Sequence, residues 1–184
     1  MKKHLLTSAI ALLLFVSGKA QIFMGKTCEI SFFSAAALEN ITAVNKTTKP
    51  ILNASTGDVL VKVSIQGFVF EKALMQEHFN ENYMESEKYP QAIFKGKIND
   101  NDKVNYKKDG VYKVSITGKL TIHGVEQDRT IDAVLTVKGG TVTVDTMFKV
   151  ALKDHNITIP ELLNQKISES VDVKMHAELT EGGK

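Results

Sequence analysis

Cysteine is almost absent from the sequence, because Cys28 is the only one among 184 residues. A single cysteine excludes a disulfide within the chain, so stability has to come from a packed core. Cys28 alternates in step with Ile30 and Phe32. This pattern predicts that Cys28 is a small buried hydrophobic residue rather than a reactive thiol.

The N-terminal apolar stretch is too short to span a bilayer comfortably. It reads LLTSAIALLLFV over residues 5–16, whereas a membrane-spanning helix needs roughly 20 apolar residues. Two lysines precede it and small residues follow it up to Ala20. This order is typical of a secretory signal peptide over residues 1–20, cleaved before Gln21. We therefore expect residues 21–184 to form one domain that is periplasmic or secreted by a bacterium.

The chain also lacks a strong charge of either sign. Its 23 basic and 21 acidic residues give a formal net charge of +2. Three of the lysines belong to the expected signal peptide, which leaves 20 basic residues against 21 acidic ones. Because no positive bias remains, we expect no nucleic-acid partner. The interspersed lysines and glutamates are typical of an ordinary solvated surface.

Alternation of apolar and polar residues dominates the rest of the sequence. This period of two predicts half-buried β-strands joined by turns such as NDND, KKDG and KGG. The segments concerned are residues 59–67, 111–124, 130–140, 141–152 and 167–179, with 27–35 and 91–98 fitting less cleanly.

Many strands and almost no helix leave two all-β architectures, a sandwich and a closed barrel. Closure would remove exposed strand edges, and an eight-stranded barrel is just wide enough for one slender ligand. An outer-membrane barrel is disfavoured because the strands carry many lysines and few aromatic residues for interfacial girdles. Glycines on the alternating rows, Gly96 and Gly118, indicate space or the bends that closure requires.

One helix interrupts the strand pattern. Residues 72–82 place Leu74 and Phe79 on an apolar stripe and acidic residues on the opposite side. Tyr89 and Pro90 then favour extended backbone and start the next strand. We expect this helix to lie at the mouth of the β structure, with its apolar stripe toward the interior.

His78 lies among glutamates on this helix and raises the question of catalysis or metal binding. His78 and Glu81 share a helix face, but zinc usually takes three or four protein ligands, so His123 or His155 would have to join them. The sequence contains no G-x-S-x-G elbow and no phosphate-binding loop. We therefore expect neither an enzyme nor a cofactor, and we keep a metal or catalytic site around His78 as an alternative.

Three stretches resemble the YceI-like family. They are MQEHFNENYMESEKYPQAIFKGKI, VSITGKLTIHGVEQDRTIDAVLTV and DHNITIP, and the junction KYPxAxFKG and the motif GxLTIHG carry the resemblance best. It implies an eight-stranded antiparallel lipocalin-like barrel with one short helix between strands. It also implies that the barrel binds a polyisoprenoid chain, and it allows a homodimer. Residues 35–57 depart from the long regular strand that the family has there.

Alternation and resemblance together predict an apolar lipid-binding site. We expect it to hold a polyisoprenoid or an isoprenoid-quinone-like chain, for storage or transport. The predicted lining residues are Ile30, Phe32, Val63, Ile65, Leu74, Phe79, Phe94, Val114, Ile116, Val144, Phe148, Val171 and Val173. The alternative is a structural or stress-response interaction module whose barrel is filled by its own side chains.

Overall fold

The computed structural model describes residues 21–35, 38–160 and 167–182, so the predicted signal peptide lies outside the described residues. Ten strands form one antiparallel sheet, and the pairing of β10 with β1 closes it. The strands are β1 (Ile22–Ala35), β2 (Asn40–Asn45), β3 (Ile51–Asn53), β4 (Asp58–Ser64), β5 (Phe68–Phe70), β6 (Gln91–Ile98), β7 (Gly110–Ile122), β8 (Val125–Lys138), β9 (Thr141–Ala151) and β10 (Ser170–Glu181).

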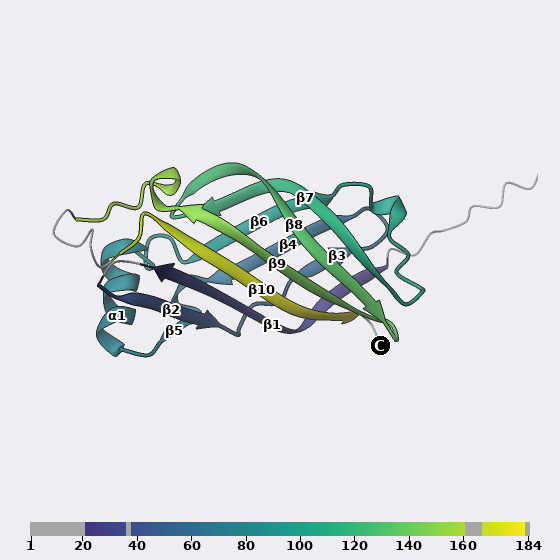
Figure 1. Cartoon of the computed structure of the whole chain (residues 1–184), viewed down its shortest axis with the longest axis horizontal. Coiled ribbons are helices and arrows are strands. Elements are labelled where there is room, and N and C mark those ends of the chain that lie inside the picture. The colour runs from purple at the N-terminus through teal and green to yellow at the C-terminus, as the bar shows by residue number, and fades with distance from the viewer. Residues whose placement is uncertain (1–20, 36–37, 161–166, 183–184) are drawn as a thin grey trace, which may run out of the picture.

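The ten strands occupy eight positions around a barrel (Figure 1). One edge of β1 pairs with β10, and its other edge pairs with β3 near its start and with β2 near its end. β2 and β3 therefore act as one interrupted strand, and β4 and β5 as a second one beside it. This confirms the predicted all-β, eight-stranded lipocalin-like barrel.

Both interruptions lie at the same level of the barrel, and Asn45 satisfies the main chain there. Its side-chain amide donates to the Ser64 carbonyl at 2.9 Å, and its Oδ1 accepts from the main-chain N–H of Thr47 at 2.9 Å. Asn45 is fully buried, where an unpaired polar group would be costly. The strand predicted over 59–67 therefore ends at Ser64, and a 3-10 turn, η1 (Ile65–Gly67), follows it.

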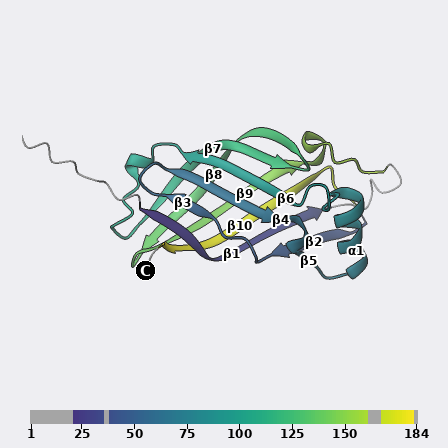
Figure 2. The same ribbon diagram turned by 180° about the vertical axis from the view of Figure 1, so that it is seen from behind.

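The predicted helix is present, but it changes from an α-helix to a π-helix along its length. The α-helix α1 (Ala73–His78) continues as a π-helical turn, η2 (Phe79–Tyr83). Figures 1 and 2 show α1 covering one end of the barrel. Two further 3-10 turns are η3 (Asn101–Lys103) and η4 (Leu152–His155). None of the described helices has the length and apolar character needed to cross a membrane.

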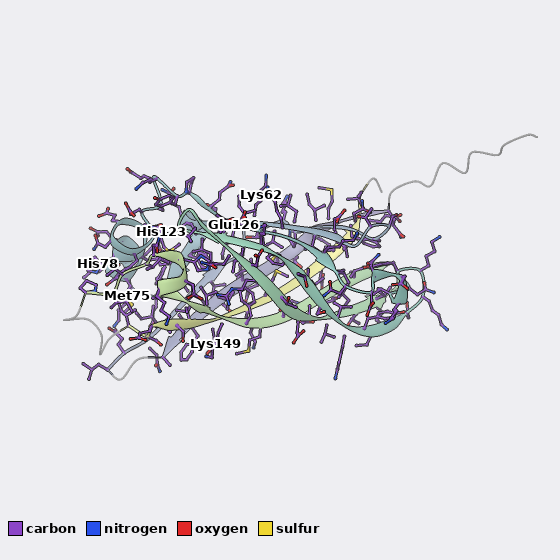
Figure 3. All side chains as sticks on the ribbon, turned by 90° about the horizontal axis from the view of Figure 1, so that it is seen from above. Lys62, Met75, His78, His123, Glu126 and Lys149 are labelled. Atoms are coloured by element: carbon purple, nitrogen blue, oxygen red, sulfur yellow. The ribbon has the colours of Figure 1, made fainter. Side chains whose placement is uncertain are left out.

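The alternation of the sequence matches the two faces of the wall. On β8, Ile131, Ala133, Leu135 and Val137 are buried. Lys62, Glu126 and Lys149, which Figure 3 labels, are exposed polar residues of the barrel strands. Cys28 is buried as predicted, and this burial raises the pKa of its thiol to about 11.

Candidate functional site

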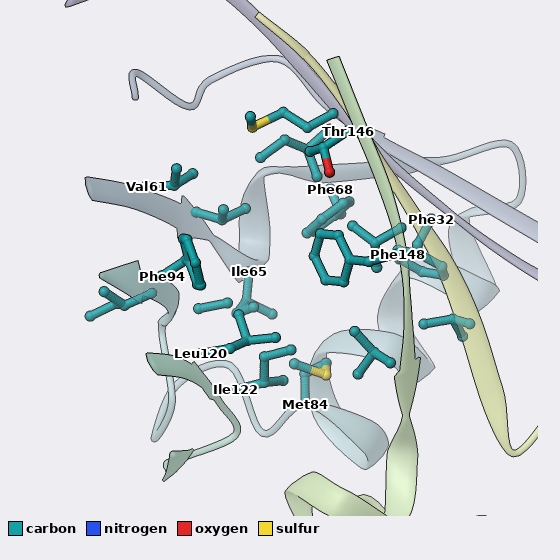
Figure 4. Close-up of a pocket in the computed structure, with 18 of the residues that line it drawn as sticks. Phe32, Val61, Ile65, Phe68, Met84, Phe94, Leu120, Ile122, Thr146 and Phe148 are labelled. Carbon is teal, nitrogen blue, oxygen red and sulfur yellow. The ribbon is translucent and has the colours of Figure 1, made fainter. Parts of the chain in front are cut away.

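The barrel encloses an apolar cavity with a volume of about 580 Å³ (Figure 4). All ten strands contribute side chains to its wall, and α1 and η2 complete it at one end. The lining consists mainly of aliphatic and aromatic residues. The alternative of a barrel filled throughout by its own side chains does not describe this structure.

The cavity is closed at the end opposite to α1. Phe23, Val104 and Tyr106 are buried there without lining the cavity, and the rings of Phe23 and Tyr106 lie 5.9 Å apart. The Tyr106 hydroxyl donates to Asn101 Oδ1 at 2.7 Å, and the Asn101 amide donates to the Ala54 carbonyl at 2.8 Å. This hydrogen-bonded core forms the floor of the cavity.

The cavity opens beside α1. Of its described lining residues, only Lys72, Leu74 and His78 are exposed, and all three belong to α1 or directly precede it. Figure 3 shows His78 at this end of the barrel. The remaining lining residues are buried or half-buried. We call this opening the mouth, defined by Lys72, Leu74 and His78.

Two facing glycines shape the wall on β6 and β7. Gly96 pairs with Gly118 across the two strands. The Phe94 ring folds over Gly96, where an added Cβ would lie 2.7 Å from the ring. A Cβ on Gly118 would lie 2.2 Å from the Lys95 carbonyl oxygen. The sequence predicted that these glycines provide space or bends in the wall. The structure shows the reason, which is that the backbones of β6 and β7 approach each other closely at this pair.

An aromatic cluster joins the helix to the wall below the mouth. Phe79 stacks on Phe32, with ring centroids 5.5 Å apart and planes at 24°. It also contacts Phe70 at 5.0 Å and Phe68 at 5.8 Å. Such ring pairs contribute about 0.5–1.5 kcal/mol each beyond their buried area. These ring contacts hold η2 against β1 and β5. Among the described residues β5 pairs with β2, whereas β6 pairs with β4, so no backbone ladder joins β5 to β6.

The few polar side chains of the lining are concentrated near the mouth. Lys72 Nζ lies 2.6 Å from Glu39 Oε1. His78 and Tyr83 also line the cavity and have no hydrogen-bond or ion-pair partner among the described residues. Thr146 lies away from this group, and its hydroxyl already donates to the Asp132 carbonyl at 2.6 Å.

His123 and His155 form a separate polar cluster, away from His78. His123 Nδ1 donates to the His155 carbonyl at 3.2 Å, and His155 Nδ1 donates to the Val125 carbonyl at 3.1 Å. Burial lowers the pKa of His155. The described residues contain no group of three or more His, Cys, Asp or Glu side chains able to hold a metal ion. The cluster that would have joined His78, Glu81 and His123 is therefore not formed.

The structure places the predicted lining residues on the cavity wall with one exception. Val114 packs against the core but does not line the cavity. The others line it: Ile30, Phe32, Val63, Ile65, Leu74, Phe79, Phe94, Ile116, Val144, Phe148, Val171 and Val173. Their contact with a lipid stays a prediction.

Sequence reasoning missed further lining residues of two kinds. Val61, Leu120 and Ile131 follow the same alternation as the predicted ones, so the pattern was sufficient to find them. Met84 and Ile157 lie in irregular segments. No periodicity exists there, so their positions become visible only in the folded chain.

A comparison with known protein families confirms the resemblance that the sequence motifs suggested. Residues 17–179 match the YceI-like domain. The chain belongs to the YceI-like family. A comparison with curated protein sequences gives no match.

Solved structures of YceI-like and related proteins share the barrel. A polyisoprenoid-binding domain from Saccharophagus degradans is 12% identical, with a TM-score of 0.77, covering 89% of this chain and 99% of that one. BcnA from Burkholderia cenocepacia is 19% identical, with a TM-score of 0.68, covering 82% and 95%. The YceI protein of Campylobacter jejuni is 18% identical, with a TM-score of 0.52, covering 97% of both chains. At these identities the similarity establishes the fold.

Proposed function

We propose that this YceI-like protein is exported and binds a polyisoprenoid or an isoprenoid-quinone-like lipid for storage or transport in the periplasm. The observation that carries the proposal is the blind apolar cavity of about 580 Å³. This volume lies within the range of about 300–1,000 Å³ that is usual for small-molecule sites. Binding requires no catalytic step.

The physical driving force is the removal of a hydrocarbon tail from water. Each CH₂ group that enters an apolar site contributes about 0.8 kcal/mol. The walls around Val61, Ile116 and Leu135 offer such a site, because their side chains have no hydrogen-bonding groups. A long, flexible, unbranched or methyl-branched chain therefore suits the cavity better than a polar metabolite does.

The relationship to solved structures adds independent support. The Saccharophagus degradans structure is described as a polyisoprenoid-binding domain, and its barrel superimposes on most of this chain. An outward-facing interaction module would not need a hollow barrel. The cavity beside α1 therefore favours lipid binding over the alternative of a purely structural module.

Extraction of the purified protein tests this proposal. The protein is isolated from its native host, extracted with organic solvent, and analysed by mass spectrometry beside an unrelated periplasmic protein purified in the same way. We expect an isoprenoid lipid in the first extract only. Absence of any co-purified lipid, together with no binding of added isoprenoids, would rule out the lipid-binding proposal.

A further inference from the structure

The wall of the barrel is interrupted between β8 and β9. These two strands pair from their shared turn only as far as Ala133 and Thr146. Beyond that point β8 continues beside β7, and β9 continues beside β10. Over this stretch, all of which the structure describes, no backbone ladder joins β8 to β9. We call the interruption the seam, defined by residues 125–132 of β8 and 147–151 of β9.

Thr146 makes the last contact between the two strands at the inner end of the seam. Its hydroxyl donates to the main-chain carbonyl of Asp132 at 2.6 Å. A side chain thus binds an acceptor that a continued ladder would bind through a main-chain N–H. Thr146 and Phe148 line the cavity from β9, as Figure 4 shows, and Ile131 lines it from β8. The seam therefore borders directly on the cavity.

A second, smaller hollow lies on the outer side of the same point. The exposed residues Asp132, Asp145 and Met147 line it. Among the described residues, only Thr146 lines both this hollow and the cavity. The barrel wall is therefore thin where the ladder between β8 and β9 ends.

The 3-10 turn η4 closes the seam where the ladder is missing. Its Leu152 lines the cavity, and its Asp154 contacts the start of β8. The Gln127 amide donates to the Asp154 carbonyl at 2.8 Å, and Arg129 Nη2 donates to Asp154 Oδ2 at 3.2 Å. Gln127 and Arg129 alternate in step with the cavity-lining Ile131, so they lie on the inner face of β8. η4 thus contacts β8 from the inside of the barrel.

These contacts hold η4 less firmly than a ladder holds a strand. The ion pair between Arg129 and Asp154 is partly exposed, so water and salt screen it. Arg129 Nε is buried but has no hydrogen-bond partner among the described residues. His155 Nδ1 adds one bond to the Val125 carbonyl at 3.1 Å. A segment held by a few side-chain contacts opens locally at a lower free-energy cost than the whole fold does.

We propose that the seam is a lateral port, through which the hydrocarbon tail of a lipid enters and leaves the cavity sideways when η4 detaches from β8. β9 ends, and η4 follows, at the same end of the barrel as α1 (Figure 1). The seam therefore begins beside the mouth and extends inward as far as Thr146. A tail that moves lengthwise instead has to pass the aromatic cluster around Phe79. This inference rests on the proposed lipid-binding function and adds the route that the lipid takes.

A variant of the ion pair tests the port through the rate of lipid exchange. Arg129→Met removes the guanidinium group and keeps much of the side-chain length. A fluorescent prenyl alcohol is transferred from the purified mature protein to an excess of phosphatidylcholine vesicles, and stopped-flow fluorescence records the rate. We expect several-fold faster loading and release with little change in the dissociation constant, because a gate alters the barrier between the bound and free states.

Lys119→Met is the matched control for this variant. Lys119 forms ion pairs with Glu126 and Asp128, on a stretch where the ladder between β7 and β8 is complete. The substitution therefore removes one positive charge from the same region of the wall without loosening η4. We expect wild-type exchange rates in Lys119→Met.

A removable crosslink tests the port in the opposite direction. Gln127→Cys and Asp154→Cys are combined in a Cys28→Ala background and joined by a short bifunctional thiol reagent that a reductant cleaves. The crosslink fixes η4 to β8, so lipid exchange should become several-fold slower. Reduction should restore the rate of the same sample. This reversal excludes misfolding as the cause of slow exchange.

Hydrogen–deuterium exchange without lipid measures the opening of the seam itself. The amides of residues 147–151 should exchange faster in Arg129→Met than in the wild-type protein, because η4 no longer covers them as often. The amides of residues 141–146, which keep their ladder to β8, should not change. An unchanged exchange of residues 147–151 overturns the role of η4 in closing the seam.

The results also separate this inference from the proposed function. Wild-type transfer rates in both Arg129→Met and the crosslinked protein overturn the port and leave lipid binding intact. Equal acceleration in Lys119→Met and Arg129→Met overturns the role of η4, since charge loss alone then explains the effect. If the prenyl alcohol does not bind to the wild-type protein at all, both the proposed function and the port are wrong.

Discussion

His123 binds Glu85 across two segments that are distant in the sequence. The Nε2 atom of His123 lies 2.7 Å from Glu85 Oε2, and its Nδ1 lies 3.2 Å from the His155 carbonyl oxygen. The two contacts use different ring nitrogens, so one imidazole ring connects the Glu85 side chain to the main chain of His155. The turn between β7 and β8, which contains His123, is thereby joined to Glu85 in the segment that follows η2.

Removal of this contact should lower stability by a modest amount. Glu85 and His123 both have positive φ angles, of 42° and 51°, a conformation that asparagine tolerates. We expect Glu85→Asn, His123→Asn and the double variant to give a coupling energy of about 1 kcal/mol in denaturant unfolding. Glu87→Asn, on an exposed neighbour, is the control. Strict additivity of the two single variants would contradict the expected coupling.

Gly118→Ala should destabilise the barrel by overpacking. The added Cβ would lie 2.2 Å from the Lys95 carbonyl oxygen and 2.4 Å from the Gly96 Cα. Both are main-chain atoms, so β6 and β7 must move apart, at a cost of about 1–3 kcal/mol. Thermal unfolding measures the loss. At Gly182 an added Cβ would lie 3.2 Å from the flexible Met24 side chain and 3.6 Å, an ordinary contact distance, from the Ile22 carbonyl oxygen. Gly182→Ala should therefore leave the unfolding temperature unchanged; an equal loss in both variants would refute the steric cause.

Acidification should destabilise the fold through His155. Burial is the first cause of its lowered pKa, and the charge of Arg129 adds to it. The unfolded chain therefore takes up a proton near its ordinary pKa of 6.5, before the folded chain does. The contribution of His155 to stability is complete above that value and is lost as the pH falls toward the lowered folded-state pKa.

We expect His155→Gln to flatten this decline in the free energy of unfolding. His176→Gln is the control with the opposite sign, because the hydrogen bond to Asp145 raises the pKa of His176. The stability from that pair is complete below the ordinary pKa and is lost as the pH rises through the raised one. Urea unfolding at a series of pH values measures both slopes. An unaltered acid decline in His155→Gln would show that another group causes it.

Filling the cavity should block lipid binding without unfolding the protein. Val63 is half-buried and lines the cavity, so Val63→Phe places a ring where we expect the tail. We expect the affinity for a prenyl lipid to fall by about tenfold or more, equivalent to the loss of a few buried CH₂ groups. Val111→Phe makes the same change at a valine that is 68% exposed. Retained affinity in folded Val63→Phe would place the lipid elsewhere.

The sequence predicted the faces of the strands better than the limits of the site. Alternation placed Val63, Phe94 and Phe148 on the inner face because side chains on a strand point to opposite sides in turn. The same rule placed Val114 on this face, yet Val114 does not line the cavity. Periodicity assigns a side chain to the inner or the outer face of a strand. Whether an inward-facing side chain reaches the cavity depends on how the neighbouring strands pack around it.

The interrupted first strands show why residues 35–57 departed from the family pattern. β2 and β3 both pair with β1, and the segment that contains Pro50 separates them. Proline has no main-chain N–H and disrupts a regular ladder. The buried amide of Asn45 then satisfies the Ser64 carbonyl. This compensation joins residues nineteen positions apart, so no local pattern could have revealed it.

By itself, the sequence determined the all-β class, the inner faces and the place of the helix, because these follow from local periodicity and turn chemistry. Only the tertiary structure decided that one end of the barrel is closed by Phe23 and Tyr106 while the other opens beside His78. Only the folded chain brought Lys72 to Glu39. These features depend on contacts between distant segments, which strand register and barrel closure establish.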